Sequence, residues 1–311
     1  MTAAASPSGP PQHYLGGIAL RLLAMASLSG MYAVVKLIDA AGVHIVESLF
    51  WRQVVILPLL VLWAVRHGGL SLFRTHRLGV HARRAVMGLT GMVLNFGGMI
   101  YLPMAEATTI NLSVPIFAVI FAALFLREPT GPARWSAAVA GFVGVLIVLN
   151  PTSMLAGGFG GDHGVGTLIA LSGAIMTALV TIQVRDLGRT ENATAIVFWF
   201  SLFSIVPLAL ALPFVVTAHS AGVWALLIGL GLLGAVAQMS LTGALRLAPV
   251  AVVTPMDYSS LLWSIACGWW LFGTTPADTT WAGAPLIVAS GLFIAWREHR
   301  RHIERAKDIA T

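Results

Sequence analysis

The sequence predicts an all-α integral membrane protein with ten transmembrane helices, arranged as two inverted repeats of five helices. Three observations lead to this fold class. Hydrophobic residues make up 58% of the 311 residues and charged residues only 10%, whereas a soluble domain has about 25% charged residues. Long apolar runs follow one another along nearly the whole chain. Finally, the pattern of residues 105–135 returns at residues 248–281.

The recurring pattern has four parts in a fixed order. A small-residue turn leads into an apolar helix that opens with Thr, Asn or Asp around a proline; a proline-bearing turn and a tryptophan that starts the next helix follow. The two tryptophans, Trp135 and Trp281, lie 146 residues apart, nearly half of the chain. Two halves with an odd number of spans each face opposite ways in the membrane, as in many alternating-access carriers.

Polar breaks divide the chain into ten candidate spans, since about 20 apolar residues cross a bilayer as a helix. Pro103 and Pro249 separate neighbours that hydropathy alone would fuse, because proline cannot donate to a continuing helical ladder. We expect residues 1–13 to be a disordered tail, 14–155 and 160–298 the two repeats, and 299–311 a basic cytoplasmic tail. The predicted spans are 15–38, 44–65, 81–102, 105–127, 133–150, 164–184, 193–216, 222–246, 250–272 and 281–297.

Charge orients the predicted bundle. With both termini in the cytoplasm, 16 of the 18 Lys and Arg residues fall on the cytoplasmic side, and Lys36 and Arg52 are the other two. This asymmetry follows the positive-inside rule of inner membranes. The net charge of +6 therefore reflects topology, and we expect a bacterial-type inner-membrane protein that contacts lipid and binds no nucleic acid. The first residues lack the basic region of a cleavable signal, so the first span is expected to stay as an anchor.

A set of segments occurs in a specific order along the chain, at residue 36 and at residues 50–53, 105–129, 135–151, 184–191 and 258–273. In this order and spacing the chain resembles the drug/metabolite transporter superfamily, in particular its ten-helix EamA-type members. The resemblance covers about residues 17–297, and no single motif carries it; the order and spacing do. It implies a 5+5 inverted repeat around a central substrate cavity, lined mainly by spans one to four and six to nine, and transport of small metabolites such as amino acids, vitamins or nucleotide-like compounds. One departure is that Arg127-Glu128-Pro129 after span four is matched by the uncharged Gly273-Thr274-Thr275-Pro276 after span nine. The segments are Lys36, FWRQ at 50–53, AEATTINLSVPIFAVIFAALFLREP at 105–129, residues 135–151, VRDLGRTE at 184–191 and YSSLLWSIACGWWLFG at 258–273.

Asp257 is the most informative single residue. It follows Pro255 and lies about seven residues into span nine, and a charge in the membrane costs roughly 2.5–3.5 kcal/mol on insertion scales. It is therefore expected to face a cavity or a partner, as a proton or cation site or as a contact to a substrate amine. The alternative is a carboxylate in the first helical turn, stabilised by the positive end of the helix dipole.

Glu47, Trp51 and Arg52 cluster in span two. Glu47 and Trp51 are spaced i, i+4 and share a helix face. Arg52 could bind a substrate carboxylate bidentately while Glu47 holds an ammonium group, which would suit a zwitterion. The competing interpretation is an internal pair of Arg52 with Asp257 or Glu47 that fastens helices together, since intramembrane charges commonly pair.

Two further charges are candidates for coupling or gating. Lys36 lies near the outer end of span one, where its long side chain can also snorkel to the interface. Glu106 lies in the outer turn before span four, either solvated or as an acidic group at the start of the helix.

Polar and aromatic residues complete the predicted substrate site. Tyr258 lies in span nine at the depth of Pro115 in span four, and Asn111 lies one turn before Pro115. Such polar helix openings in corresponding places indicate a binding site. Asn95 and Gln238 are candidates too, although either can simply form an interhelical hydrogen bond. Trp263 lies in the middle of span nine, whereas most of the ten tryptophans fit the usual enrichment at membrane interfaces.

The remaining motifs exclude other classes of function. The glycines of Gly229-Leu230-Gly231-Leu232-Leu233-Gly234 match GxGxxG, but a dinucleotide site requires a preceding strand, so close helix packing explains them better. No nucleophile–base or metal-binding pattern is present, and the single Cys267 excludes disulfides within the chain. We therefore expect no enzyme activity, no cofactor and no metal.

The sequence thus predicts a secondary carrier, a monomer or homodimer, that moves a small metabolite by alternating access. An amino-acid-like zwitterion that is exported or exchanged is the leading substrate class, because of the charges at Glu47, Arg52 and Asp257. The alternative is uptake of a larger heteroaromatic metabolite such as a vitamin or S-adenosylmethionine, and a lipid-moving protein is a third reading. Coupling to protons or to a counter-substrate is left open.

Overall fold

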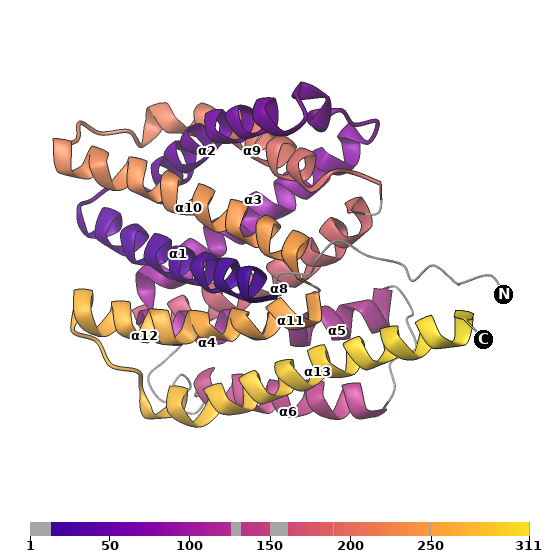
Figure 1. Cartoon of the computed structure of the whole chain (residues 1–311). Helices are drawn as coiled ribbons and strands as arrows, with labels where there is room; N and C mark the ends of the chain where they lie inside the picture. The colour runs from indigo at the N-terminus through magenta and orange to yellow at the C-terminus, as the bar shows by residue number, and fades with distance from the viewer. Residues whose placement is uncertain (1–13, 126–131, 150–160, 189, 249, 311) are drawn as a thin grey trace.

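The computed structural model describes residues 14–125, 132–149, 161–188, 190–248 and 250–310, and within these ranges every regular element is helical. The predicted tail 1–13, the repeat boundary near residue 155 and the Arg127–Pro129 motif lie outside the described residues. The helices form one elongated bundle (Figure 1). The elements are α1 (Tyr14–Ala40), α2 (Ile45–His67), η1 (Leu70–Phe73), α3 (Leu78–Tyr101), α4 (Met104–Asn111), α5 (Val114–Phe125), α6 (Pro132–Leu149), α8 (Asp162–Leu187), α9 (Ala193–Ala211), η2 (Leu212–Phe214), α10 (Ala221–Leu247), α11 (Val250–Val253), η3 (Thr254–Tyr258), α12 (Ser259–Phe272) and α13 (Asp278–Ala310).

The helices confirm the predicted class, an all-α membrane fold. In the described ranges, seven helical stretches are long and apolar enough to cross a bilayer, and Trp135–Leu149 is a shorter apolar helix. The third and ninth predicted spans are also helical, and they correspond to α3 and to the segment from α11 to α12. However, α3 carries Arg83, Arg84 and Asn95, and α12 is only 14 residues long. The count of ten crossings therefore stays a prediction.

Two helices are interrupted at corresponding places in the two halves. The fourth predicted span consists of α4 and α5, separated at Leu112 and Ser113 just before Pro115. The ninth consists of α11, the 3-10 turn η3 with Pro255 in its first turn, and α12. Proline removes a backbone donor from the helical ladder, so both breaks occur where the sequence places a proline among polar residues.

The two halves interlock instead of forming separate bundles. Helix α1 packs mainly on α10 and α3 mainly on α8, while α2 packs on α9 and α6 on α13. In an internal repeat of five helices, α1 corresponds to α8 and α10 corresponds to α3, so the α1–α10 and α3–α8 contacts are equivalent. The pairs α2–α9 and α6–α13 each join a helix to its own counterpart in the other half. Figure 1 shows α6 and α13 side by side along one edge, with α2 and α9 along the other.

Glycine permits the closest of these helix contacts. A Cβ added at Gly98 of α3 would lie 2.8 Å from the Cβ of Ala170 in α8, and one at Gly17 of α1 would lie 2.6 Å from the Cβ of Ala248. The sequence Gly229–Gly234 lies inside α10, where Gly231 packs against Val55 of α2. Gly231 and Gly234 therefore have the expected packing role, whereas nothing lies within 4 Å of a Cβ added at Gly229.

The ends of the bundle differ in what they contain. Helix α1 begins and α13 ends at the same end (Figure 1), here called the terminal end. The connections from α2 to α3 and from α8 to α9, with Arg74, Arg77 and Arg185, are at this end too. The opposite end holds the starts of α2, α4, α8, α10 and α13.

Candidate functional site

A bidentate ion pair joins the halves near the terminal end. Arg21 of α1 donates from Nε and Nη2 to the two carboxylate oxygens of Asp257 in η3, at 2.5 and 2.6 Å. The side chains are 14% and 29% exposed. Asp257 therefore has a partner, as predicted, but the partner is Arg21 and not Arg52.

Glu47 is bound within the protein at the opposite end. Its Oε1 lies 2.7 Å from Nε2 of His219, which precedes α10, and accepts a 3.3 Å hydrogen bond from the indole of Trp51. The Trp51 ring in turn lies edge-on to Trp224 of α10. The Glu47 side chain is fully buried, and its Oε2 has no hydrogen-bond partner.

Glu106 and Lys36 also act as links between helices at this end. Glu106 is in the first turn of α4, which matches the predicted acidic group at the start of the helix. Its side chain is buried, and its Oε1 lies 2.9 Å from Nε2 of His163 in α8. The Nζ of Lys36 is bound within the protein: it donates to the carbonyl oxygens of Met99, Ile100 and Leu102 at the end of α3, at 3.0, 3.2 and 2.7 Å. Lys36 thus satisfies carbonyl groups that a helix end leaves unpaired.

Arg52 has a different environment from the other charged candidates. It is the eighth residue of α2, and its guanidinium donates only to sulfur, at 3.4 Å to Met31 of α1 and 3.2 Å to Met92 of α3. Gly234 of α10 leaves space for it. Among the described residues no carboxylate pairs with Arg52, so the expected pairs with Asp257 or Glu47 do not occur.

A second buried guanidinium belongs to the same region. Arg84 of α3 stacks on Phe200 of α9 at 3.9 Å from the ring centroid. Its Nε and Nη1 are buried without a hydrogen-bond partner, and its positive charge is close enough to Arg52 for the two to repel. Gln53 of α2 is fully buried with both amide atoms unpartnered. Buried polar groups of this kind are costly when they lack a hydrogen-bond partner.

The amide candidates form an interhelical network. Asn95 of α3 donates to the carbonyl of Gly91 and to Thr177 of α8, at 2.7 and 2.9 Å, and accepts from Asn111 of α4 at 2.6 Å. The network fixes α3, α4 and α8 together next to the break between α4 and α5. It fits the interhelical interpretation of Asn95, and substrate contact by Asn111 stays a prediction.

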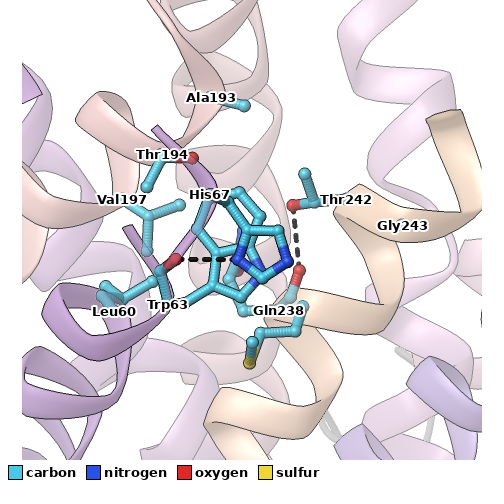
Figure 2. A pocket seen from close by; sticks show the side chains of 10 residues that line it. Leu60, Trp63, His67, Ala193, Thr194, Val197, Gln238, Thr242 and Gly243 are labelled. Carbon is cyan, nitrogen blue, oxygen red and sulfur yellow. Dashed lines mark hydrogen bonds between the residues drawn. The ribbon is translucent and has the colours of Figure 1, made fainter. Parts of the chain in front are cut away.

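The last three candidates lie apart from one another. Tyr258 ends η3 and packs against Gly291 of α13. Trp263 of α12 is 42% exposed, beside the exposed Leu262. Gln238 of α10 lines a cavity of about 140 Å³ between α2, α9 and α10, together with Trp63 and Thr242 (Figure 2). Figure 2 also shows His67 in this cavity, which therefore lies toward the terminal end, where α2 ends.

Sequence reasoning missed the partners of the charged candidates. Arg21 and Arg84 count in the sequence only among the basic residues of the cytoplasmic side, and His163 and His219 fall in connections between predicted spans. Their partners lie far away along the chain, 236 residues for Arg21 and 172 for His219. The one available signal was the repeat itself, since each of these bases lies near the start of a predicted span.

Interlocked halves, two interrupted helices and buried charges at both ends define a multi-pass membrane transporter. Comparison with known families then places the chain: it belongs to the EamA-like transporter family, whose model matches residues 15–150 and 164–296. The two matched stretches cover the two halves of the bundle.

Named relatives are transporters of small metabolites. A riboflavin transporter of Vibrio cholerae is 32% identical over 255 residues, covering 81% of this chain and 82% of its own length. An S-adenosylmethionine uptake transporter of Rickettsia conorii is 28% identical, covering 92% and 95%, and the pseudopaline exporter CntI of Pseudomonas aeruginosa is 27% identical, covering 88% and 94%. These are transporters and not enzymes.

The fold also has a counterpart among solved structures. One crystal structure aligns with a TM-score of 0.60 at 18% identity, covering 90% of this chain and 96% of the other. At this identity the likeness concerns the fold alone. The family match and the named relatives, and not this likeness, identify the chain as a membrane-embedded transporter of a small molecule.

Proposed function

We propose that this protein takes up a heteroaromatic metabolite by alternating access, with riboflavin as the first candidate. The observation that carries the proposal is the difference between its buried charges. Glu47 and Asp257 are each engaged by a base of the protein, whereas the guanidinium groups of Arg52 and Arg84 have no carboxylate partner among the described residues.

This difference bears directly on the substrate class. A zwitterion needs a carboxylate to receive its ammonium group, and both predicted carboxylates are already bound. A flavin ring presents carbonyl oxygens, and its side chain presents hydroxyls, which accept hydrogen bonds from guanidinium and amide donors. The riboflavin transporters among the relatives, which include a second one 35% identical in Rhizobium johnstonii, support the same choice.

Orientation and energy source belong to the proposal. The protein lies in a bacterial inner membrane. Its terminal end, which carries Arg74, Arg77 and Arg185, faces the cytoplasm, following the positive-inside rule. The halves, residues 14–155 and 160–298, rock against each other around the interrupted helices. An ion gradient, an exchanged substrate or the substrate's own gradient supplies the energy.

Uptake of riboflavin into proteoliposomes tests the proposal, since the intrinsic fluorescence of the flavin reports both binding and accumulation. Arg52→Gln and Arg84→Gln should each raise the KM for riboflavin about tenfold or more, because a hydrogen bond to a charged group contributes about 1.5–3 kcal/mol. Arg83→Gln is the matched control: it removes the neighbouring arginine, which is exposed, and should leave KM within about twofold.

Labelled amino acids and S-adenosylmethionine serve as competing substrates. Saturable uptake of an amino acid without riboflavin binding would refute the proposal and favour the zwitterion. Flip of labelled lipid without any soluble substrate would favour the lipid-moving alternative.

A further inference from the structure

Two acid–base contacts hold the halves together at the opposite end, which is the outer end in the proposed orientation. Glu47 of α2 meets His219 before α10 at 2.7 Å, with side chains 0% and 4% exposed. Glu106 of α4 meets His163 of α8 at 2.9 Å. Each contact joins the first half of the chain to the second.

Two contacts of the same kind lie at the terminal, cytoplasmic end. Glu191, just before α9, faces His81 of α3. Asp257 of η3 binds Arg21 of α1. In the internal repeat, α2 corresponds to α9, and the start of α10 corresponds to the start of α3. In the same way, α4 corresponds to the opening of the ninth span, and α8 corresponds to α1. The four contacts are therefore two pairs related by the internal repeat.

The chemistry of the pairs breaks this symmetry. Both outer contacts use histidine, the side chain whose ordinary pKa lies within the physiological range. One cytoplasmic contact uses arginine, which stays charged at every physiological pH. Acid outside the cell can therefore change the charge of both outer contacts, whereas acid inside leaves the Arg21–Asp257 pair unchanged.

We propose that the outer end is a proton-sensitive gate, in which protons bind at His219 and His163 and hold the outer end closed. The inference rests on the alternating-access part of the proposed function and not on the identity of the substrate. A protonated histidine places a positive charge beside a buried carboxylate, which is otherwise costly in a desolvated site.

The geometry of the two ends supports this reading. At the outer end Glu47 is fully buried with one oxygen unpartnered, so it depends on the charge that His219 can supply. At the cytoplasmic end the His81–Glu191 distance is 3.8 Å, and both ring nitrogens of His81 are buried without a hydrogen-bond partner. The two outer contacts, at 2.7 and 2.9 Å, are therefore shorter than the histidine contact at the cytoplasmic end.

Other titratable or charged groups adjoin the outer contacts. At the outer end, His44 is at the start of the helix that carries Glu47. Asp162 precedes His163 in α8, and Tyr101 of α3 packs on Gly166 in the same helix. Lys36 is held by three α3 carbonyls and His44 accepts from the Val46 amide. Around Glu191 and His81 lie Arg77, Arg84 and Asp186, and Arg77 is paired with Asp186 at 2.7 Å.

Spin-label distances across the outer end test the gate without any substrate. Labels at Ala41→Cys and Ala218→Cys, in a Cys267→Ser background, report the separation of the α1–α2 and α9–α10 connections, where both alanines are exposed. Between about pH 7.5 and about pH 5.5, the ratio of short to long distances should rise about fivefold or more, because a charge-assisted hydrogen bond is roughly twice as strong as a neutral one.

Matched variants assign the response. His219→Gln with His163→Gln keeps two possible donors but removes both titrating groups, so the distances should no longer change with pH. His44→Asn, which replaces a third outer histidine with a residue that still caps α2, should respond like the parent. Glu47→Gln should weaken or reverse the acid response while the protein stays monodisperse. The proposal is overturned if the parent distances do not change with pH, if acid lengthens them, or if the double glutamine variant responds like the parent.

Discussion

Replacing Asp257 by Asn tests how much the ion pair near the terminal end contributes to stability and transport. An exposed ion pair contributes about 0–1 kcal/mol, whereas breaking a fully buried pair costs about 3–5 kcal/mol. The Arg21 and Asp257 side chains are 14% and 29% exposed and form two short bonds. We therefore expect Asp257→Asn to lower the free energy of unfolding by about 2–3 kcal/mol. This is less than the loss for a fully buried pair, because both side chains keep some contact with water.

Thermal unfolding in detergent measures this cost. At about 2–4 °C for each kcal/mol, Asp257→Asn should lower Tm by roughly 4–12 °C. The matched control is Asp186→Asn, which breaks the more exposed pair with Arg77, whose side chains are 33% and 53% exposed, and should cost about 0–1 kcal/mol. Arg21→Gln combined with Asp257→Asn should cost less than the sum of the single changes, since both remove the same interaction.

Two results would refute the reasoning about this pair. One is a Tm for Asp257→Asn no lower than for Asp186→Asn, and the other is strict additivity in the double variant. Transport gives an independent measure, because we expect the Asn variant to lose uptake. Full uptake with the parent's pH profile would remove Asp257 from the mechanism.

Two further predictions concern helix packing. Lys36→Met should lower the free energy of unfolding by about 1–3 kcal/mol, because three α3 carbonyls lose their donor; an unchanged Tm in detergent would show that water replaces the ammonium group. Gly98→Ala should cost about 1–3 kcal/mol by forcing α3 away from Ala170 of α8, whereas Gly229→Ala in α10, where nothing lies within 4 Å, should be neutral or slightly stabilising. Equal Tm values for the two alanine variants would contradict the close approach of α3 and α8.

The sequence was sufficient for the fold class because that class depends on local properties. Apolar length, proline breaks and the repeat of residues 105–135 at 248–281 are all visible without knowing which helices touch. The breaks at Ser113 and η3 occur beside the prolines that predicted them. The α6 to α13 and α1 to α10 neighbours were not predictable, since apolar helices of similar composition give no sign of which faces meet.

The sequence singled out the charged candidates but did not show which groups pair with them. Glu47, Trp51 and Asp257 are in contact with charged or polar partners, yet the choice among Arg21, Arg52, His163 and His219 depends on how two distant segments cross. Rotation of a helix by one residue would change which base a carboxylate meets. Charge alone therefore named the groups, and only packing assigned the partners.

The interlocking of the halves has a consequence for biosynthesis. Arg21 must be inserted long before Asp257, which lies 236 residues further along the chain. At about 5–20 residues per second, the ribosome needs roughly 10–50 seconds to supply the carboxylate. During that wait α1 also lacks α10, its main packing neighbour. The newly made first helix therefore has to keep its arginine at the lipid headgroups, by snorkelling, or inside the insertion machinery, until the last third of the protein has been translated.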